Sequence, residues 1–360
     1  MLVAHDMMGA DNTLVWYVDN AREGNDGTSW EKAFKYLYTA LAEAAYATGS
    51  NKPQEIWVAG GGNYYYPTSE PSARNATFQL PSDIALYGGF KGNESSLAYR
   101  DPDANPTILS GDIKNTPDDA SDDCYHIVTG TDGIILDGFT IQDSNAIGNS
   151  SGGGMIIYPC TGSFKVENCT FQNNRAGAGG GIFIGKPLSD YQTTSSSYPH
   201  STIKNCKFIN NTGASGGGGI YCYNSNISVT NCLFSGNKSY DHGWPGGGAI
   251  AMDDFALGHI ANCFFINNKA HTGGAISNNY EPHVFIEGCV FAGNHAYYEG
   301  GAIMNYFVQG TTMIINCTFT GNTSDEYGGA MHCNSMNVEV EILNSIFWDN
   351  IILPKNWAHD

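Results

Sequence analysis

The sequence predicts an all-β protein, a right-handed parallel β-helix with a short N-terminal capping helix. Three observations support this fold: a repeat at spacings of 26 to 37 residues, strand-like alternation inside the repeat, and no room in it for a long helix. The repeat is Phe followed three residues later by Asn, and it occurs seven times between residues 168 and 350. The pairs are Phe171/Asn174, Phe208/Asn211, Phe234/Asn237, Phe265/Asn268, Phe291/Asn294, Phe319/Asn322 and Phe347/Asn350.

A second residue type is fixed within the repeat, because a Cys stands two residues before each of the first six Phe. Ser345 takes this place in the seventh copy, and the successive positions are 37, 26, 31, 26, 28 and 28 residues apart. A glycine pair follows, as in Gly247-Gly248-Ala249-Ile250. Fixed anchor points separated by insertions are typical of a solenoid. The six cysteines are Cys169, Cys206, Cys232, Cys263, Cys289 and Cys317.

Local patterns indicate the kind of coil. Residues 166–171 (Val-Glu-Asn-Cys-Thr-Phe) and 314–319 (Ile-Ile-Asn-Cys-Thr-Phe) alternate with period two, as strands do. The Gly-Gly-Ala-Ile stretches give a second short strand, and no part of the repeat supplies a helix of ten residues. Leucine-rich, ankyrin and tetratricopeptide repeats are therefore excluded, and a right-handed parallel β-helix is the fold that fits.

Stacked coils place identical positions above one another, because parallel strands pair at about 4.8 Å. We therefore expect Val166, Cys169, Phe171 and their counterparts to fill a narrow, dry core. The Asn that follows each Phe suits a turn, where its amide would bond its own backbone and the Asn of the coil above. The glycine pairs suit tight corners that a Cβ atom would block.

The repeat continues upstream in weaker form. Residues 136–141 align with 166–171, so that Phe139 takes the Cys place and Ile141 the Phe place, and residues 152–156 are the matching glycine corner. Short strands are expected at Glu55–Ala59, Asp83–Gly88 and Thr107–Asp112. We therefore divide the chain into an N-terminal strand and capping helix (1–54), irregular first coils (55–133), regular β-helix repeats (134–350) and a C-terminal tail (351–360).

The two ends of the solenoid differ. Thr28 and Glu31 match a capping box, and Ala33, Leu37, Ala40, Leu41 and Ala44 recur at helical spacing, which predicts a helix over about residues 29–47 that covers the first coil. The ten residues after Asn350 are too short for such a cap. We expect the natural chain to continue, a partner to cover this end, or Trp357 to fold back over it.

Composition excludes several classes of function. The formal net charge is −19 and the pI is near 4.7, which disfavours binding to nucleic acid and to anionic membranes. No apolar run has transmembrane length, so we expect no membrane insertion. Residues 1–5 lack the features of a signal peptide. A low fraction of charged residues, together with abundant Ser, Thr, Asn, Gly and Tyr, favours an extracellular or cell-surface protein.

The chain has ten cysteines, of which the six repeat cysteines are expected to serve as core residues rather than as disulfides or metal ligands. Six occupy one inward ladder, where a thiol behaves as a small apolar group. No Cys-x-x-Cys pair is present, which argues against zinc. Cys124 and Cys160, which lie about one coil apart, are the one candidate disulfide.

The combination of Phe-x-x-Asn with Gly-Gly-Ala-Ile resembles the repeat of chlamydial polymorphic outer-membrane proteins. The N-terminal third resembles the "choice-of-anchor Q" group of right-handed β-helix surface proteins. Together the two resemblances cover nearly the whole chain and imply export and surface display, without defining a ligand. The residues that carry the second resemblance are 16–19 (WYVD), 24–30 (GNDGTSW), 56–59 (IWVA), 86–90 (LYGGF) and 107–112 (TILSGD).

We expect the function to lie on the outer surface, between the Asn and the glycine pair of each repeat. Stacking would bring carboxylates, imidazoles and aromatic rings into one rim that suits an extended sugar chain. Directly after the Asn, a second row of Arg175, Lys238, Lys269 and His295 would run beside it. The interpretation is a secreted, non-catalytic module for adhesion or glycan binding, whose partner is an extended glycan or a host or neighbour surface. The predicted ligand-binding residues are Asp241, His242, Trp244, His271, Tyr297, Tyr298, Glu299, Glu326 and Tyr327, with Asp325 beside them.

The first alternative is a polysaccharide lyase or glycoside hydrolase. A lyase needs a base and a group that neutralises the sugar carboxylate, whereas a hydrolase needs two carboxylates. The chain has only four Arg, which is few for a polyuronate site. The Asp-Asp and Gly-His fragments near residues 253–259 differ in spacing from the motifs of polygalacturonases. Candidate catalytic residues are Lys238, Lys269, His271, Glu299, Asp253 and Asp254.

Two further hypotheses concern assembly and metal. An open end and a flat flank would suit end-to-end association, as in a self-assembling surface-layer or filament subunit. No cofactor is expected, with the exception of calcium in one acidic loop. The candidate calcium ligands are Asp118, Asp119, Asp122 and Asp123.

Overall fold

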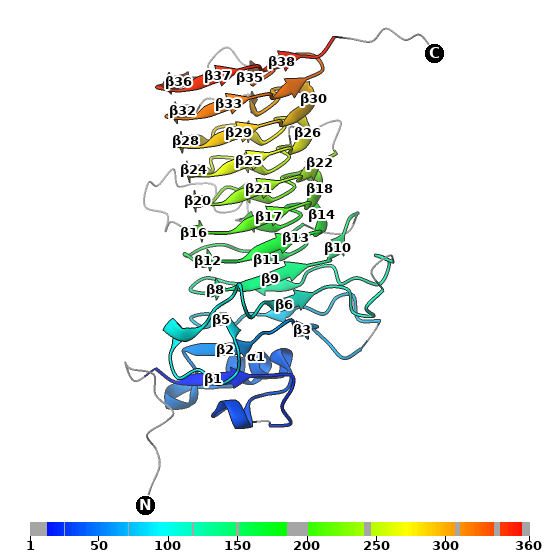
Figure 1. The fold of residues 1–360 in the computed structure, drawn as a ribbon, viewed down its shortest axis with the longest axis vertical. Coiled ribbons are helices and arrows are strands. Elements are labelled where there is room, and N and C mark those ends of the chain that lie inside the picture. The colour runs from blue at the N-terminus through cyan, green and yellow to red at the C-terminus, as the bar shows by residue number, and fades with distance from the viewer. Residues whose placement is uncertain are drawn as a thin grey trace, which may run out of the picture.

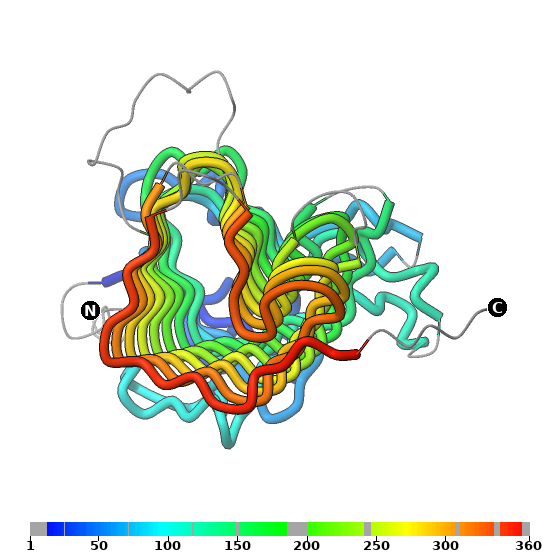
Figure 2. The backbone as a smooth tube through the Cα atoms, turned by 90° about the horizontal axis from the view of Figure 1, so that it is seen from above, coloured from blue at the N-terminus to red at the C-terminus, as the bar shows by residue number. Residues whose placement is uncertain are grey.

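The chain winds into a right-handed parallel β-helix whose coils stack along one axis (Figure 1). The structure, a computed structural model, describes residues 13–24, 26–70, 72–116, 119–148, 151–185, 201–240, 246–306, 310–334 and 339–354. Viewed along the axis, the regular coils follow the same path and stack above one another with a small offset from each coil to the next (Figure 2). Within the described residues the strands form four parallel sheets, and the predicted fold class is confirmed.

Each regular coil visits the four sheets in the same order, which we number sheet 1 to sheet 4. Sheet 1 begins beside the N-terminal helix and runs the length of the solenoid. Its strands are β1 (Val15–Val18), β2 (Glu55–Ala59), β5 (Ala85–Phe90), β8 (Ile135–Asp137), β12 (Lys165–Glu167), β16 (Ser201–Lys204), β20 (Asn226–Thr230), β24 (Leu257–Ala261), β28 (His283–Glu287), β32 (Thr311–Ile315) and β36 (Glu339–Leu343).

Sheet 2 follows sheet 1 after a single turn and contains the Phe of every repeat. Its strands are β3 (Tyr64–Tyr65), β6 (Thr107–Ser110), β9 (Phe139–Gln142), β13 (Thr170–Gln172), β17 (Lys207–Ile209), β21 (Leu233–Ser235), β25 (Phe264–Ile266), β29 (Val290–Ala292), β33 (Thr318–Thr320) and β37 (Ile346–Trp348).

In each coil, sheet 3 comes directly after the repeat Asn, and sheet 4 comes directly after the glycine corner. Sheet 3 contains β10 (Asn145–Ala146), β14 (Arg175–Ala178), β18 (Thr212–Gly216), β22 (Lys238–Ser239), β26 (Lys269–Thr272), β30 (His295–Glu299), β34 (Thr323–Ser324) and β38 (Ile351–Ile352). Sheet 4 contains β4 (Phe78–Gln79), β7 (Val128–Gly130), β11 (Met155–Ile157), β15 (Ile182–Gly185), β19 (Ile220–Tyr223), β23 (Ile250–Asp253), β27 (Ile276–Asn279), β31 (Ile303–Tyr306) and β35 (Met331–Asn334).

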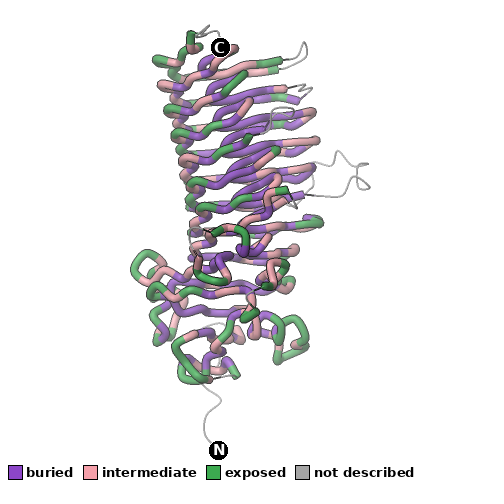
Figure 3. The backbone as a smooth tube through the Cα atoms, turned by 90° about the vertical axis from the view of Figure 1, so that its right-hand side faces the viewer, coloured by how far each residue is buried: buried purple, intermediate pink, exposed green. Residues whose placement is uncertain are grey.

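The core is a set of ladders of identical side chains. The Phe rings from Phe171 to Phe347 stack with centroids 4.5–5.2 Å apart and planes within 6° of parallel. The six repeat cysteines form a second buried ladder, as predicted, and burial raises the pKa of the Cys206 thiol. Buried backbone alternates with exposed backbone along the whole solenoid (Figure 3). The apolar ladder residues from Phe171 to Phe319 are accordingly buried, whereas those of the last described coil are exposed.

The repeat Asn forms a third buried ladder, which differs from the expected turn. The Asn268 side chain donates to Phe234 O and Asn294 Oδ1, both at 3.0 Å, and its Oδ1 accepts from the backbone and side-chain amides of Asn237. The predicted bond between successive Asn is therefore present. The predicted bond to its own backbone is replaced by bonds to the neighbouring coils, because the side chain points along the solenoid axis.

The turns are made by other residues, which adopt left-handed backbone conformations. Asn168 (φ 52°) and Asn173 (φ 56°) bracket strand β13, and Asn262 (φ 54°) and Asn267 (φ 54°) bracket β25. Asn tolerates this region better than most residues, and Gly replaces it in other coils. The sharp bends at both ends of the short sheet 2 strand therefore come from the residue before each Cys and the residue before each ladder Asn.

The N-terminal helix is shorter than predicted. Helix α1 spans Leu37–Tyr46, whereas residues Trp30–Lys32 form the 3₁₀ turn η1, and Ser29 makes no side-chain cap bond. The reason is tertiary, because Trp30 packs edge-on against Tyr17 and donates its indole N–H to Glu94 O at 2.9 Å. The predicted helical positions are nevertheless buried against the first coils. Short 3₁₀ turns η2 (Gly49–Asn51) and η3 (Leu97–Tyr99) complete the helical elements of the described residues.

The structure shows the state of the candidate disulfide and the exposure of the last described coil. Cys124 and Cys160 are buried as thiols rather than joined as a disulfide, and their Sγ atoms lie 3.5 Å from His126 O and Gly162 O. In the last described coil, Ile346 and Trp348 are 61% and 72% exposed. Trp357, predicted to fold over this end, lies outside the described residues.

Strand β25 offers a matched pair of substitutions that tests the Phe ladder. Phe265 is fully buried, whereas its neighbour Phe264 is 50% exposed on the outer face. Phe265→Ala should destabilise the protein by about 3–5 kcal/mol, because it leaves a cavity between stacked rings. Phe264→Ala should change stability by less than about 1 kcal/mol. Urea denaturation followed by circular dichroism measures both, and equal effects would contradict the ladder.

Candidate functional site

The predicted rim forms at one edge of the solenoid, over sheet 3 and the turn that leads to sheet 4. It comprises the outward side chains of β26 and β30, the segment after β34 and the outer side of β35. On β30 the small Ala296 points inward and is buried, whereas Tyr297 and Tyr298 are 46% and 37% exposed. The register between β26 and β30 shifts at this point, which accommodates an extra residue. The shift exposes two consecutive tyrosines instead of one.

A chain of four aromatic rings crosses three coils of the rim. His271 stacks on Tyr298 with centroids 5.5 Å apart, and Tyr298 meets Tyr327 edge-on at 5.8 Å. Tyr327 in turn lies 5.5 Å from His332. We call these four residues the ring chain. It forms because the coils stack in register, and it presents the rings of Tyr298 and Tyr327 to solvent.

Glu299 lies behind the ring chain rather than on its surface. It is 4% exposed, and its Oε1 lies 3.8 Å from Nε2 of His332. Burial raises the pKa of the Glu299 carboxyl, while the neighbouring His332 opposes this shift. The buried carboxylate can therefore orient the imidazole of His332. A direct role for Glu299 in ligand contact is limited by its burial.

The second predicted row lies beside the ring chain in the expected register. We call its residues, Arg175, Lys238, Lys269 and His295, the cationic row. Lys238 pairs with Lys269, which pairs with His295, while Thr212 stands between Arg175 and Lys238. The His295 ring hydrogen-bonds Thr323 Oγ1 at 2.9 Å, approaches Asp325 at 3.8 Å and meets Tyr297 edge-on. Burial lowers the pKa of His295, and Asp325 works in the opposite direction.

Not all predicted site residues come together. Asp241, His242 and Trp244 lie outside the described residues. Glu326 follows the strand β34 and donates its backbone N–H to Tyr298 O, so it belongs to the rim. The candidate catalytic residues are divided: Lys238, Lys269, His271 and Glu299 lie on sheet 3, before the glycine corners, whereas Asp253 and Asp254 lie at the far end of the sheet 4 strand β23.

Asp253 has its own partner at that distant location. Tyr221 donates its hydroxyl to Asp253 Oδ2 at 2.6 Å. Burial raises the pKa of Asp253 to about 6, with Tyr221 opposing and Asp254 adding to the shift. His259, the other half of the polygalacturonase-like fragment, lies on sheet 1 with its Nε2 3.0 Å from Glu287. The two fragments are therefore on different sheets.

The raised pKa of Asp253 predicts a pH dependence of stability. Its folded-state pKa of about 6 exceeds the ordinary 3.8, so the folded protein binds this proton more tightly than the unfolded chain. The resulting stabilisation is present below about pH 4 and is lost as pH rises through about 6.

Melting temperatures of wild type and Asp253→Asn between pH 4 and 7.5 provide the measurement. The amide keeps an oxygen for Tyr221 but cannot ionise. The difference in melting temperature should therefore shift in favour of the variant as pH rises. A difference that is constant across this range would contradict the assignment.

A cleft that the sequence did not reveal lies between the 91–106 segment and the outer face of sheet 2. It has a volume of about 680 Å³ and is lined by Phe139, Thr140, Thr170, Lys207 and the loop residues Leu97 and Pro102, among others. Thr140, Thr170 and Lys207 stack in register on β9, β13 and β17. The sequence signal was weak, because these residues belong to the outward positions of ordinary repeats.

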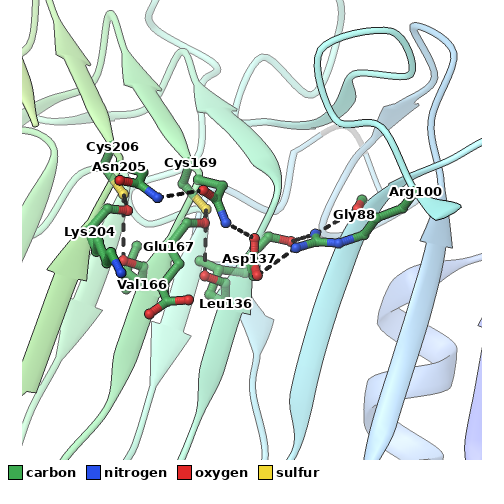
Figure 4. Close-up of polar contacts among 11 residues, drawn as sticks. Gly88, Arg100, Leu136, Asp137, Val166, Glu167, Cys169, Lys204, Asn205 and Cys206 are labelled. Atoms are coloured by element: carbon green, nitrogen blue, oxygen red, sulfur yellow. Dashed lines mark hydrogen bonds and ion pairs between the residues drawn. The ribbon is translucent and has the colours of Figure 1, made fainter. Parts of the chain in front are cut away.

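A buried ion pair holds the loop over this cleft. The Arg100 guanidinium contacts Asp137 Oδ2 at 2.6 Å and donates to the backbone oxygens of Gly88 and Asp137 (Figure 4). Asn168 donates to the same carboxylate, and Asn205 donates to Asn168. The Arg100 and Asp137 side chains are 12% and 8% exposed. Arg100 is thus committed to holding the loop rather than to binding a ligand.

The acidic loop brings together a set of carboxylates that differs from the predicted one. Asp112, Asp122 and Asp123 are buried, and each offers an oxygen within 4.8 Å of the others. Burial and the charges of Asp112 and Asp122 raise the pKa of Asp123 to about 7. Asp119, a predicted ligand, is exposed and caps the backbone N–H of Ser121. Asp118 lies outside the described residues.

Comparisons with known proteins agree with this architecture. Residues 113–269 match the family model "Right handed beta helix region", and residues 288–306 and 316–333 match the "Chlamydia polymorphic membrane protein (Chlamydia_PMP) repeat". The fold is thus a right-handed β-helix, and two of its repeats are similar to the polymorphic membrane protein repeat, in agreement with the resemblance of the sequence pattern. The resemblance of the N-terminal third to the choice-of-anchor Q group stays a prediction.

Two curated proteins are similar in sequence. A protein named "Probable autotransporter YfaL" from Escherichia coli (strain K12) is 28% identical over 135 residues, which cover 31% of this chain and 10% of that protein. The metabotropic glutamate receptor-like protein R of Dictyostelium discoideum is 26% identical over 222 residues, which cover 60% of this chain and 10% of that protein. The chain thus spans about a tenth of the length of these relatives.

Among solved structures, the A-module of the mannuronan C-5 epimerase AlgE4 from Azotobacter vinelandii aligns over 92% of this chain and 97% of that module. The identity is 10% and the TM-score is 0.18, so the alignment carries no functional argument. Within the described part of the chain, no helix has the length and apolar character needed to cross a membrane.

Proposed function

We propose that this protein is a surface-displayed β-helix that binds extended glycans along the ring chain without cleaving them. The observation that carries this proposal is the exposed ring chain itself, with Tyr298 and Tyr327 in contact across neighbouring coils. Exposed aromatic faces stack well on the apolar faces of sugar rings, and the adjacent imidazoles and carboxylates suit hydroxyl groups. The similarity to an autotransporter and to polymorphic membrane proteins supports the surface location.

The charge of the protein narrows the class of glycan. A formal net charge of −19 repels polyanions at long range, so uncharged polysaccharides are favoured over polyuronates. Lys238 and Lys269, which pair on adjacent strands, are positively charged and could bind occasional acidic substituents of the glycan. The extended shape of the rim favours a polymer over a monosaccharide, because the rings span several coils.

Cleavage receives less support from the same geometry. Glu299 is buried behind the rings, and Asp253 is separated from the rim by the length of a sheet 4 strand. Two carboxylates facing one glycosidic bond are the usual requirement for hydrolysis. The geometry of the rim therefore fits retention of a glycan better than turnover.

Glycan retention can be tested with the exposed tyrosines. Wild type should bind at least one immobilised polysaccharide from a panel of xylan, pectate, alginate, chondroitin and capsular polymers, and should bind the uncharged members more tightly than the polyanions. Tyr298→Ala should weaken that binding about tenfold, which corresponds to about 1.4 kcal/mol of lost stacking, without lowering the melting temperature. Tyr46→Ala is the control, because Tyr46 is 87% exposed on α1, away from the rim.

The same panel distinguishes binding from catalysis. Under the proposal, no reducing ends or unsaturated uronates should be released, with or without calcium. Depolymerisation that is lost in Lys269→Ala or His271→Ala would replace the binding function with the lyase or hydrolase alternative. Retention that is unchanged in Tyr298→Ala would show that the ring chain is not the binding surface.

A further inference from the structure

We propose that the loop between β6 and β7 binds a divalent cation of the calcium type through Asp112, Asp122 and Asp123. This site is separate from the ring chain, and the proposal does not depend on glycan binding. The three residues are 7%, 6% and 6% exposed, so they form a buried cluster rather than a solvated acidic surface.

The spacing of the carboxylates suits one shared cation. Calcium–oxygen bonds are about 2.3–2.6 Å long, so two ligands of one ion lie at most about 5 Å apart. The nearest oxygens of the three side chains all fall within 4.8 Å of one another. The donors are all oxygen, which favours calcium or magnesium over zinc or copper.

Asp123 supplies an independent indication of a ligand. Asp112 accepts the backbone N–H of Thr116, and Asp122 accepts the Thr116 hydroxyl and lies 3.4 Å from Lys114 Nζ. By contrast, no hydrogen bond or ion pair is made by the Asp123 carboxylate within the described residues, although the residue is 6% exposed and a carboxylate oxygen lies within 4.8 Å of the other two side chains. Three carboxylates held this close repel one another when ionised, and a bound cation would offset that repulsion.

The guanidinium of Arg74 lies near this loop but does not form an ion pair with the Asp123 carboxylate. Arg74 donates through Nε to the backbone oxygen of Asp123 and through Nη2 to the backbone oxygen of Asn145. Its guanidinium also lies over the ring of Tyr125, at 4.4 Å from the centroid. Arg74 therefore fixes the backbone of the loop and leaves the Asp123 carboxylate without a direct ion pair.

Hydrogen bonds to neighbouring backbone groups hold the loop around the three carboxylates in place. The Cys124 N–H bonds Gly111 O at 2.8 Å and closes the loop at its base. Asn145 at the start of β10 donates its backbone N–H to Cys124 O and its side chain to Ala120 O, at 2.9 and 2.7 Å. Since β10 is the first strand of sheet 3, a cation in this loop would stabilise the end at which that sheet begins.

Calcium binding can be measured directly on the whole chain by isothermal titration calorimetry, with terbium luminescence as a second readout. Wild type should bind one calcium ion, and its melting temperature should be higher in 1 mM calcium chloride than in EDTA, because a ligand of the folded state stabilises it. Asp123→Asn should weaken calcium binding at least tenfold and abolish the thermal shift.

Asp119→Asn is the matched control, because Asp119 is an exposed aspartate of the same loop. This variant should bind calcium as wild type does. Asp123→Asn should still melt cooperatively in EDTA, since it removes a crowded charge; if it does not fold, Asp122→Asn replaces it in the titration. Absence of calcium binding by wild type, or undiminished binding by the folded Asp123 or Asp122 variant, would overturn the proposal.

Discussion

The amide ladder of the repeat Asn is the interaction on which the rest of the structure depends. Each ladder Asn bonds the backbone and side chain of the coil before it and the side chain of the coil after it. Because these partners are unique, one residue of slippage would leave buried donors and acceptors unpaired. The stacked Phe rings, the inward thiols and the register of the outer surface all follow from this alignment. Directional bonds thus determine where the non-directional packing occurs.

Under the proposed function, the ligand contacts lie at positions that the ladders do not use. The outward side chains of sheet 3 are free to vary, and a register shift between β26 and β30 turns two neighbouring tyrosines outward. His332 reaches the same surface from sheet 4, across the glycine corner. The rim therefore combines residues from two sheets and several coils. Under the proposed function, a rigid scaffold that holds these rings at fixed separations would reduce the entropy lost on binding an extended ligand.

The sequence predicted the ladders well because each ladder is a local pattern repeated many times. It predicted the surface less well, for physical reasons that differ among residues. Asn174 and Asn173 are neighbours of the same type, and only the structure shows that the first is buried and the second makes the turn. Trp30 lies in a 3₁₀ turn outside the predicted helix, because it packs on Tyr17. Asp112 joins Asp122 only because the loop closes at its base, and spacing in the sequence does not report loop closure.

The buried amide ladder also determines what deamidation would do to the protein. Deamidation replaces one NH₂ group by oxygen and leaves the shape of the side chain nearly unchanged. At Asn268 this change would direct a carboxylate oxygen at Phe234 O and Asn294 Oδ1, where two hydrogen bonds are now donated. The damage would pass to both neighbouring coils, since each depends on that amide. Resistance to deamidation therefore requires that water be excluded from the ladder, and its members are fully buried from Asn174 to Asn322.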